Sequence, residues 1–464
     1  MLTYVFDKNS GVPLYEQLYR FIKADILSGK ISGGSKLPSK RELAANLGIS
    51  KVTVESAYAS LISEGYVYSL EKKGYYCEKN LTIQQETKQT EKRRSKPLNS
   101  EKQLIADLSA NSVPTSQFPF SVWSKLTREV IASYSRELLE PIPYNGVKAL
   151  RDAIAQYVSQ VKGMSVDAER IIIGAGSEYL YSQIIRLLGN DKIYAIENPS
   201  YRKIAKVYDM NGVSYKYIPV RKNGIDIDAL KKSGADAVHI SPSHNFPTGN
   251  VTDAKVRHEI ISWAKKDGRF IIEDDFDSEL RFNGLPLPPL QTLDTDSSKV
   301  IYINTFSKTI SPAFRISYMI LPLNLSEKYA RTLSFNSCTV PSLEQFTLAR
   351  FISSGHYERH INRMKKYYKL LRSELFEEFA HSELSQYAKI SEAQAGLHFI
   401  IEFDSGLTDK QMKAYLDSRG VNASFMSDYY TDGEKNEGEI LVNYSGLNAE
   451  SFGKVLKILS EAKK

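Results

Sequence analysis

One lysine stands out in the stretch TFSKTISPAFRISYM, residues 305–319, which directly follows the apolar run KVIYIN. Lys308 lies among hydroxylated and apolar residues just after this predicted strand, and Arg315 follows seven positions later. A solvent-exposed lysine would explain the pattern. A chemical explanation is also open, because a lysine amine can attack a carbonyl group and a neighbouring arginine can hold an anion.

Two further predicted strand ends could complement such a lysine. In IIIGAGSEYLYSQII, residues 171–185, a strand passes through a glycine turn that includes Gly176 into a helix that begins near Ser177. Backbone N–H groups at the start of a helix bind phosphate, although an ordinary turn with Ser177 as its cap explains the pattern equally. In IENPSYRK, residues 196–203, Tyr201 either packs in the core or stacks on a flat ligand ring.

A third predicted strand ends in three acids, Glu273, Asp274 and Asp275. A buried carboxylate requires a positive partner, and a protonated heterocyclic nitrogen would be one. A metal ion is an alternative partner, but no His or Cys cluster accompanies the acids, so we predict no metal site; an acidic helix start is the structural alternative. Together with the glycine turn, the tyrosine and Lys308, the acids match pyridoxal 5′-phosphate (PLP), which forms a Schiff base with lysine and needs a protonated ring nitrogen.

The elements around these residues predict an α/β fold. Short apolar runs alternate with helical patterns, which is typical of a mostly parallel central sheet covered by helices. The predicted strands are 170–174, 192–197, 237–242, 269–275, 299–304 and 315–321. A long helical region begins at about residue 324, and the runs LHFIIEF and ILVNYS predict a smaller α+β C-terminal subdomain.

The first 78 residues have a different pattern. Apolar spacing predicts three helices, at 14–26, 41–47 and 51–64. Ser39 and Glu42 form a capping box for the second helix, and Ser50 caps the third. A short basic hairpin follows, so the region predicts a winged helix-turn-helix; a small helical packing domain is the structural alternative. The residues expected to face DNA bases or phosphates are Arg41, Ser50, Lys51, Val52, Thr53, Lys72 and Lys73.

The composition separates these two parts. Residues 79–103 carry 7 Lys and Arg against 3 acids and nearly lack large apolar side chains, so we predict a flexible basic linker between domains 1–78 and 104–464. The chain of 464 residues has no apolar stretch long enough for a membrane span and no secretory signal. Its two distant cysteines, Cys77 and Cys338, favour a cytoplasmic location.

The segment LPSKRELAANLGISKVTVESAYASLISEGYVYSLEKKGYY resembles the GntR family of bacterial repressors across nearly the whole N-terminal module. The resemblance implies binding to double-stranded operator DNA and adds Gly74, on the wing, to the residues named above. Glu55 departs from the family, in which several members have a basic residue at this position.

Residues 104–464 resemble the fold type I aminotransferases, and the combination with a GntR-like head resembles the MocR/GabR regulators. The stretches that carry the resemblance are SQFPFSVW, PYNGVKALRDAIAQY, SPSHNFPTGNV, IIEDDFDSE and TFSKTISPAFRISYM. The resemblance implies a homodimer and assigns Lys308 to the Schiff base; Arg315, Thr305, Ser307, Gly176 and Ser177 to the phosphate; Tyr201 to ring stacking; Asp274, ahead of Asp275, to the pyridine nitrogen; Asn245 or His244 to the ring hydroxyl; and Tyr144 to the phosphate of the partner subunit's cofactor.

Two positions depart from the aminotransferase pattern. Phe276 stands where the family has a tyrosine whose hydroxyl contacts the ring oxygen of PLP, and Leu441 stands where aminotransferases have an arginine for the substrate carboxylate. Arg202 or Lys203 could replace that arginine. We therefore predict a PLP-dependent transcriptional regulator that binds operator DNA as a dimer and senses a small amine or amino acid through aldimine exchange at Lys308, with little or no turnover. An active aminotransferase with an accessory DNA-binding domain and a scaffold without PLP are the alternatives.

Overall fold

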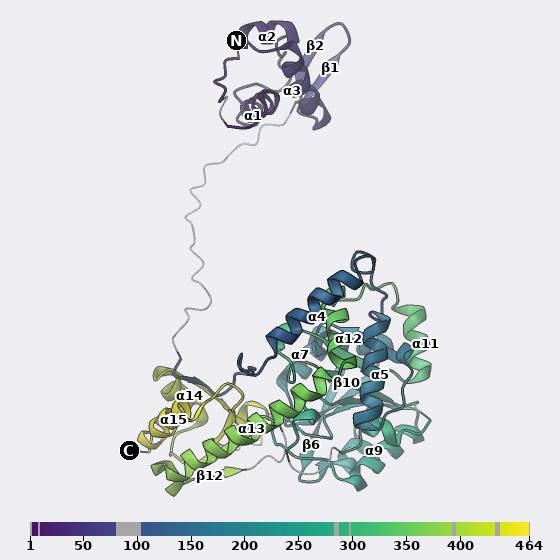
Figure 1. Ribbon diagram of the computed structural model, residues 1–464, viewed down its shortest axis with the longest axis vertical. Helices are drawn as coiled ribbons and strands as arrows, with labels where there is room; N and C mark the ends of the chain where they lie inside the picture. The colour runs from purple at the N-terminus through teal and green to yellow at the C-terminus, as the bar shows by residue number, and fades with distance from the viewer. Residues whose placement is uncertain are drawn as a thin grey trace. The chain divides into compact units, whose positions relative to one another are not determined.

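The chain divides into two compact units, Met1–Ser100 and Glu101–Lys464 (Figure 1). The structure is a computed structural model, which describes residues 2–7, 10–79, 104–282, 287–296, 298–391, 396–431 and 437–463. The division falls inside the predicted linker 79–103, and apart from Lys79 that linker lies outside the described residues.

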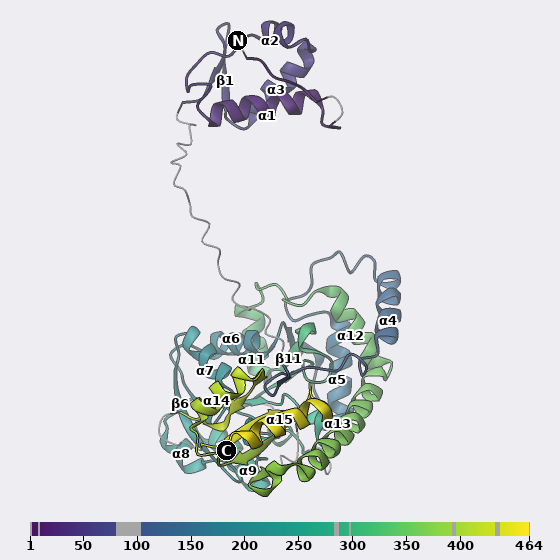
Figure 2. The same cartoon turned by 90° about the vertical axis from the view of Figure 1, so that its left-hand side faces the viewer.

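The N-terminal unit is a helical domain with a short hairpin (Figure 2). Its elements are α1 (Leu14–Leu27), α2 (Lys40–Leu47), α3 (Lys51–Ser63), β1 (Val67–Leu70) and β2 (Gly74–Cys77). The capping box of Ser39 and Glu42 is complete, and the Ser50 side chain accepts a hydrogen bond from the Thr53 N–H. Leu18, Ile22 and Tyr58 are fully buried where α1 packs against α3. The predicted winged helix-turn-helix arrangement is therefore present.

The C-terminal unit is built on an eight-stranded sheet, in the order β4-β11-β10-β9-β8-β5-β6-β7. The strands are β4 (Ile171–Gly174), β5 (Ile193–Asn198), β6 (Ser214–Arg221), β7 (Gly224–Ile225), β8 (Ala237–Ile240), β9 (Phe270–Asp274), β10 (Val300–Thr305) and β11 (Ser317–Ile320). Only β11 and the edge strand β7 run antiparallel to their neighbours in this described sheet. The predicted α/β class is confirmed.

Helices cover both faces of the sheet. One face packs against α4 (Phe120–Ser133), α5 (Lys148–Lys162), α12 (Ser342–Ser353), α8 (Ile227–Lys232), α9 (Ala254–Lys266) and α10 (Leu290–Leu293). The other face packs against α6 (Ser177–Leu188), α7 (Arg202–Met210) and α11 (Leu323–Thr332). Alternate residues of each strand serve the two faces, as Ile301 and Tyr302 do, so most strands are apolar throughout.

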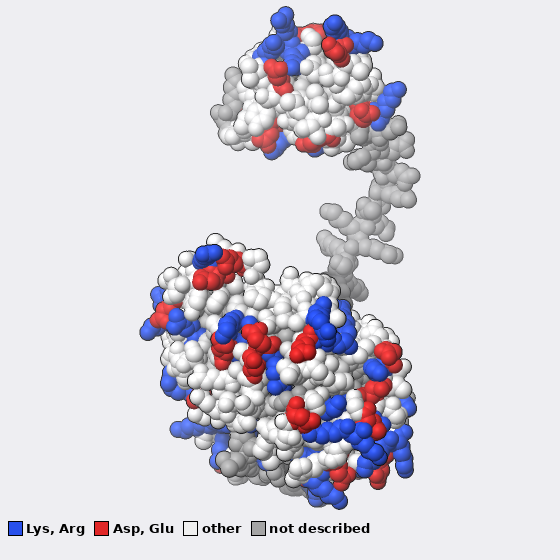
Figure 3. All heavy atoms as spheres, turned by 90° about the vertical axis from the view of Figure 1, so that its right-hand side faces the viewer, with Lys and Arg blue, Asp and Glu red and all other residues white. Residues whose placement is uncertain are grey.

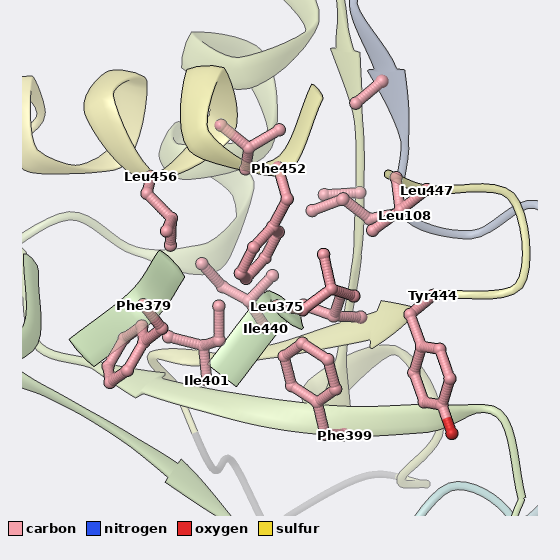
Figure 4. Close-up of a cluster of buried hydrophobic side chains, with 14 of the residues drawn as sticks. Leu108, Leu375, Phe379, Phe399, Ile401, Ile440, Tyr444, Leu447, Phe452 and Leu456 are labelled. Atoms are coloured by element: carbon pink, nitrogen blue, oxygen red, sulfur yellow. The ribbon is translucent and has the colours of Figure 1, made fainter. Parts of the chain in front are cut away.

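The predicted C-terminal subdomain is a four-stranded antiparallel sheet, in the order β12-β13-β16-β15. Its strands are β12 (Ala388–Ser391), β13 (His398–Phe403), β15 (Ser424–Phe425) and β16 (Glu439–Asn443), and its helices include α14 (Asp409–Ser418) and α15 (Ala449–Glu461). Phe399, Ile440 and Phe452 meet in its core (Figure 4). Helix α13 (His356–His381) contributes its first turns to the core of the larger sheet and its later turns to this second core.

Two details of the predicted strands were wrong. Strand β6 was not predicted, and the expected strand 315–321 begins at Ser317 instead. Arg315 has a φ of 53°, a left-handed conformation that cannot continue into a strand. This turn positions the arginine side chain beside the end of β4.

Candidate functional site

The predicted site residues gather at one edge of the large sheet. Strands β4, β5, β8, β9 and β10 run in the same direction, so their carboxyl ends lie together. Asp274 is the last residue of β9, Thr305 is the last residue of β10, and Gly176 follows β4 by two positions. The sequence-based expectation that one site combines these strand ends is consistent with this arrangement.

Arg315 and Gly176 form a cradle in front of helix α6. The Arg315 guanidinium donates hydrogen bonds to the Ala175 carbonyl at 3.4 Å and to the Glu178 carboxylate at 2.9 Å. A Cβ atom on Gly176 would lie 2.2 Å from Arg315 Nη2, and Gly176 has a φ of 96°, so only glycine fits. Ser177 begins the helix beside this arginine, so an anion there would meet the helix start and a guanidinium that pairs with Glu178 in this structure. The N–H groups of Ala175 and Gly176 already donate to Thr339 and Gly174.

Hydroxyl groups hold the turn after β10. Thr305 Oγ1 donates to Ser307 Oγ at 2.9 Å and accepts from Ser317 Oγ at 2.8 Å. The Ser307 N–H also donates to Thr305 Oγ1, at 3.2 Å. These bonds fix the backbone that leads directly into Lys308.

Lys308 occupies a half-buried position after this turn. Burial lowers the pKa of the Lys308 ammonium, and the Asp277 carboxylate partly opposes that effect. Its Nζ atom lies 5.9 Å from the centre of the Phe276 ring. A lowered pKa raises the fraction of neutral amine, which is the nucleophilic form.

Asp274 and Asp275 have different surroundings. Asp275 accepts hydrogen bonds from Lys162 Nζ at 2.7 Å and from the Tyr302 hydroxyl at 2.6 Å. Burial alone would raise the pKa of Asp275, but the Lys162 ammonium outweighs it and holds that pKa below its usual value. Asp274 accepts a hydrogen bond from Tyr181, whereas its Oδ1 atom is buried and has no partner in the described part of the chain. Asp275 Oδ1 is likewise buried without a partner in this part of the chain, so the two acids differ in their cation: Asp275 pairs with Lys162, whereas no described Lys or Arg pairs with Asp274. Of the two acids, Asp274 is therefore the better candidate for a cationic ligand.

Sequence reasoning missed the residues around Asp274. Tyr181 lies four positions after Ser177 on helix α6, on the same helix face, and this spacing was the available signal. His239 Nε2 lies 3.6 Å from Asp274 Oδ2 and is also buried without a hydrogen-bond partner among the described residues. Nothing in the local sequence distinguished His239 from a core residue of β8.

Tyr201, Asn245 and Tyr144 occupy different environments. The ring of Tyr201 is 39% exposed and meets Phe246 edge-on, with 6.0 Å between the ring centres. Asn245 Nδ2 is buried and has no partner among the described residues, so it can still donate to a ligand. Tyr144 stacks on Tyr329 at 6.0 Å, and its expected contact with a second subunit stays a prediction.

The position predicted to lack a substrate-binding arginine is apolar. Leu441 is buried in β16, opposite Ile400 and Ser424. Of the two suggested replacements, Lys203 lies 3.4 Å from the Glu178 carboxylate, while Arg202 is exposed at the start of α7. Arg202 is therefore the better candidate for a carboxylate ligand.

A separate cavity lies on the other side of β9. It has a volume of about 190 Å³ and is lined by Lys162, Asp275, Ser278, Glu279 and Lys365, together with residues of α5 and α13. Apart from Asp275, the less favoured of the two acids, none of the described residues expected to bind a cofactor lines this cavity, so it is not the proposed PLP site.

The N-terminal unit presents the predicted DNA-facing residues at its surface. Lys51 is exposed at the start of α3, and Val52 is 69% exposed. Lys72, at the hairpin tip, has a φ of 57°, and Lys73 is exposed beside it. Figure 3 shows Lys and Arg side chains on this unit with acidic side chains between them. Glu55 of α3 forms an ion pair with Lys40 of α2 within this unit.

Comparison with known proteins places both units in known families. The family models "Aminotransferase class I and II" and "Bacterial regulatory proteins, gntR family" match residues 104–457 and 14–77. The "Uncharacterized HTH-type transcriptional regulator YdeL" of Bacillus subtilis is 35% identical over 432 residues, which covers 90% of each chain. This chain belongs to the GntR-type transcriptional regulators with an aminotransferase domain. The "Probable rhizopine catabolism regulatory protein MocR" of Rhizobium meliloti is 28% identical over 474 residues, with 99% of this regulator and 95% of MocR covered.

Solved structures show the same fold in the C-terminal unit. Pyrococcus horikoshii kynurenine aminotransferase, solved with PMP, matches with a TM-score of 0.69 and 22% sequence identity. The match covers 78% of this regulator and 91% of the enzyme chain. No described helix of the regulator is long and apolar enough to cross a membrane, and the described residues contain no cluster of three or more metal-binding side chains. The GntR domain gives the regulator a DNA-binding unit.

Proposed function

We propose that this regulator binds operator DNA as a homodimer, holds PLP on Lys308 and senses an amine or amino acid that competes for the cofactor. The observation that carries the proposal is Asp274, which lies buried at the same sheet edge as Lys308 and Arg315, with its Oδ1 atom unpartnered and with no Lys or Arg partner among the described residues. A buried carboxylate oxygen without a partner is costly unless a ligand with a proton or positive charge satisfies it.

The residues at this edge fit PLP. Asp274 suits a protonated ring nitrogen, Arg315 beside Gly176 suits a phosphate, and Lys308 has the lowered pKa that attack on an aldehyde requires. When bound, PLP supplies an electrophilic carbonyl carbon and an electron-withdrawing ring. The further proposed contacts are Tyr201 on the ring face, Ser177, Thr305 and Ser307 at the phosphate, and Asn245 at the ring substituents.

The proposed DNA contacts lie on α3 and the hairpin. The N-terminal residues of α3 would enter the major groove, where the exposed methyl groups of Val52 suit a thymine methyl. Ser50, Lys51 and Thr53 lie at the same helix end. Arg41, Lys72 and Lys73, with Gly74 allowing the tight wing, would contact phosphates.

Exposed apolar side chains support the proposed homodimer. Phe120 and Ile131 of α4 are 60% and 51% exposed, and Leu139, a few residues later, is 90% exposed. Large apolar side chains at the surface favour contact with another protein surface. We propose that a second copy covers them and that Tyr144 then reaches the partner's phosphate site.

Phe276 and Leu441 favour a regulator that senses a ligand over an enzyme that transaminates amino acids. Leucine cannot bind a carboxylate in the bidentate way that arginine does, so efficient transamination of ordinary amino acids is not expected. An active aminotransferase with an accessory DNA-binding unit is the second candidate, because Lys308 and Asp274 are both in place.

The visible absorbance of full-length protein mixed with PLP tests the proposal. We expect a visible band that Lys308→Ala abolishes, and a titration with amines and amino acids should change the band without accumulation of keto acid. A band that survives in Lys308→Ala would contradict the assignment of Lys308. Sustained turnover of about 1 per second or more would favour the aminotransferase instead.

A further inference from the structure

The cavity on the other side of β9 has both apolar and charged walls. Tyr157 of α5 and Ile361 of α13 line its apolar part, and Lys162, Asp275 and Glu279 line its charged part. An apolar cavity of about 150 Å³ in a protein is large enough to hold benzene. This cavity, with a volume of about 190 Å³, therefore has room for one small organic molecule.

The Lys162 ammonium already uses all of its donors in this group. Its Nζ atom lies 2.7 Å from Asp275 Oδ2, 2.7 Å from Ser278 Oγ and 2.8 Å from Glu279 Oε1. An ammonium group has three N–H donors, and these three contacts occupy them. Lys162 therefore has no donor left for the second oxygen of either carboxylate.

One oxygen of each carboxylate remains unsatisfied. The Tyr302 hydroxyl donates to Asp275 Oδ2 at 2.6 Å, and the Asn304 amide donates to Glu279 Oε1 at 3.2 Å, so both reach the oxygens that Lys162 already contacts. Asp275 Oδ1 and Glu279 Oε2 are buried and have no partner among the described residues, and each side chain is only 2% exposed. Buried carboxylate oxygens of this kind are stabilised by a donor that carries a positive charge.

The charges around the cavity favour a cation over an anion. Of the described residues that line it, Asp275, Glu279 and Glu358 are acids, whereas Lys162 and Lys365 are the bases. Burial lowers the pKa of the Lys365 ammonium, and the charge of Glu279 opposes that effect. Glu279 Oε2 has no hydrogen bond from Lys365 or from any other described residue, so its place for a donor is still open.

We propose that this cavity is a second ligand site, which binds a small aliphatic ammonium ion. The N–H groups of the ligand would donate to Glu279 and Asp275, and its alkyl chain would pack against Tyr157, Val161 and Ile361. A metal ion fits less well, because the described residues contain no group of three or more metal-binding side chains. The inference does not depend on the binding of PLP, since successive side chains at the end of β9 point to opposite faces of the sheet.

Titration calorimetry of the full-length protein, freed of PLP, tests the proposal with n-butylammonium chloride. Without PLP the amine has no aldehyde to attack, so only non-covalent binding is measured. We expect a Kd of about 1 mM. n-Butanol, which has the same chain without the charge, and potassium chloride, which has the charge without the chain, should both bind at least about tenfold more weakly.

Two variants locate the bound amine. Glu279→Gln removes one carboxylate of the cavity, and we expect it to raise the Kd for n-butylammonium about tenfold or more. Asp274→Asn changes the acid on the opposite face of the sheet, at the proposed PLP site, and should leave this Kd unchanged. Thermal melting checks that each variant is folded. If Glu279→Gln does not fold, Asn362→Arg replaces it, because it adds bulk and a positive charge to the exposed α13 side of the cavity.

Four results would overturn the inference. The first is a wild-type protein that does not bind n-butylammonium, and the second is equal binding of potassium or n-butanol. The third is an affinity that falls in Asp274→Asn, which would put the amine in the proposed PLP site. The fourth is a wild-type affinity in Glu279→Gln, or in Asn362→Arg where that variant replaces it. A wild type without a visible band in the presence of PLP would refute only the proposed binding of PLP, so the two failures stay distinct.

Discussion

Two neighbouring carboxylates at the end of β9 have opposite surroundings. Asp275 lies in a closed group with Lys162 and Glu279, whose Oε1 atom is 2.8 Å from Lys162 Nζ. Asp274, one position earlier, accepts a hydrogen bond from Tyr181 and has no Lys or Arg partner among the described residues, while the Oδ1 atom of each acid is without a partner there. Successive residues of a strand point to opposite faces, so a single step along the backbone separates the two environments.

The difference distinguishes structural from ligand-binding acids. The charge of Asp275 is compensated by a buried lysine of the same chain, so this group contributes to the folded state without any ligand. Within the described residues, Asp274 has a hydrogen bond from Tyr181 and His239 Nε2 at 3.6 Å but no Lys or Arg partner, so a cationic group from outside can take that place. The absence of a cation partner from the same chain, rather than the burial of the acid, therefore indicates which carboxylate binds the ligand.

Removal of the Lys162 ammonium should have the largest effect. Lys162→Met keeps the aliphatic stem but leaves Asp275 and Glu279 buried without a cation, and we expect the free energy of unfolding to fall by about 3–5 kcal/mol. Urea denaturation measures this. Lys148→Met, on the same helix, is the control, because Lys148 is 70% exposed and its ion pair, with Asp152, lies at the surface; this change should cost less than about 0.5 kcal/mol.

The ion pair between Lys162 and Asp275 also predicts how the free energy of unfolding changes with pH. The pKa of Asp275 in the folded state is below its usual value, so the ionised carboxylate adds to the free energy of unfolding. This stabilisation is fully present above the unfolded-state pKa of about 4, and it is lost as the pH falls through the folded-state pKa. Wild type should lose stability over this acidic range, and Lys162→Met should lose less. A similar acid response in both proteins would mean that the ion pair is not stabilising.

Replacement of Asp274 should weaken the cofactor more than the fold. Asp274→Asn removes the charge at the open position, and we expect the Kd for PLP to rise about 10- to 100-fold, with a change of less than about 1 kcal/mol in the free energy of unfolding. Absorbance titration and urea denaturation measure the two quantities. Asp275→Asn is the matched variant, and it should show the reverse pattern. A larger loss of PLP affinity in Asp275→Asn would exchange the roles assigned to the two acids.

Removal of the Tyr181 hydroxyl should have the smallest effect. Tyr181→Phe deletes one hydrogen bond to Asp274 while the ring stays packed against His239, at 4.8 Å between ring centres. We expect the Kd for PLP to rise about fivefold, which corresponds to about 1 kcal/mol. An unchanged Kd would show that Tyr181 does not orient Asp274 for the ligand.

Local signals were sufficient for most of the fold. The capping box of Ser39 and Glu42 spans four residues and is present in the structure, and the apolar runs of the parallel strands are also continuous in sequence. Strand β6 was missed because its exposure alternates and it contains Pro219, which is unusual inside a strand. The start of β11 was placed too early because the left-handed conformation of Arg315 leaves no mark in the residue pattern.

The site was predictable only in part because its second layer joins distant segments. Lys308, Arg315 and Asp274 could be named from their places after predicted strands. Tyr181 and Asp274 are 93 positions apart, and Lys162 and Asp275 are 113 positions apart. No spacing rule connects residues at such separations, so the choice between the two acids required the folded structure.

Helix α13 joins the core of the large sheet to the core of the C-terminal subdomain. Its 26 residues form one continuous rod, about 39 Å long at 1.5 Å per residue, with Ile361 near one end in the core of the large sheet and Leu375 in the core of the subdomain. Because the helix is continuous, a tilt of about 5° about its middle would move each of its ends by about 1.7 Å without breaking a backbone hydrogen bond. His360, in the second turn of this helix, has its Nε2 atom 2.7 Å from the carbonyl oxygen of Thr309, so the segment that follows β10 is joined directly to the helix that enters the subdomain.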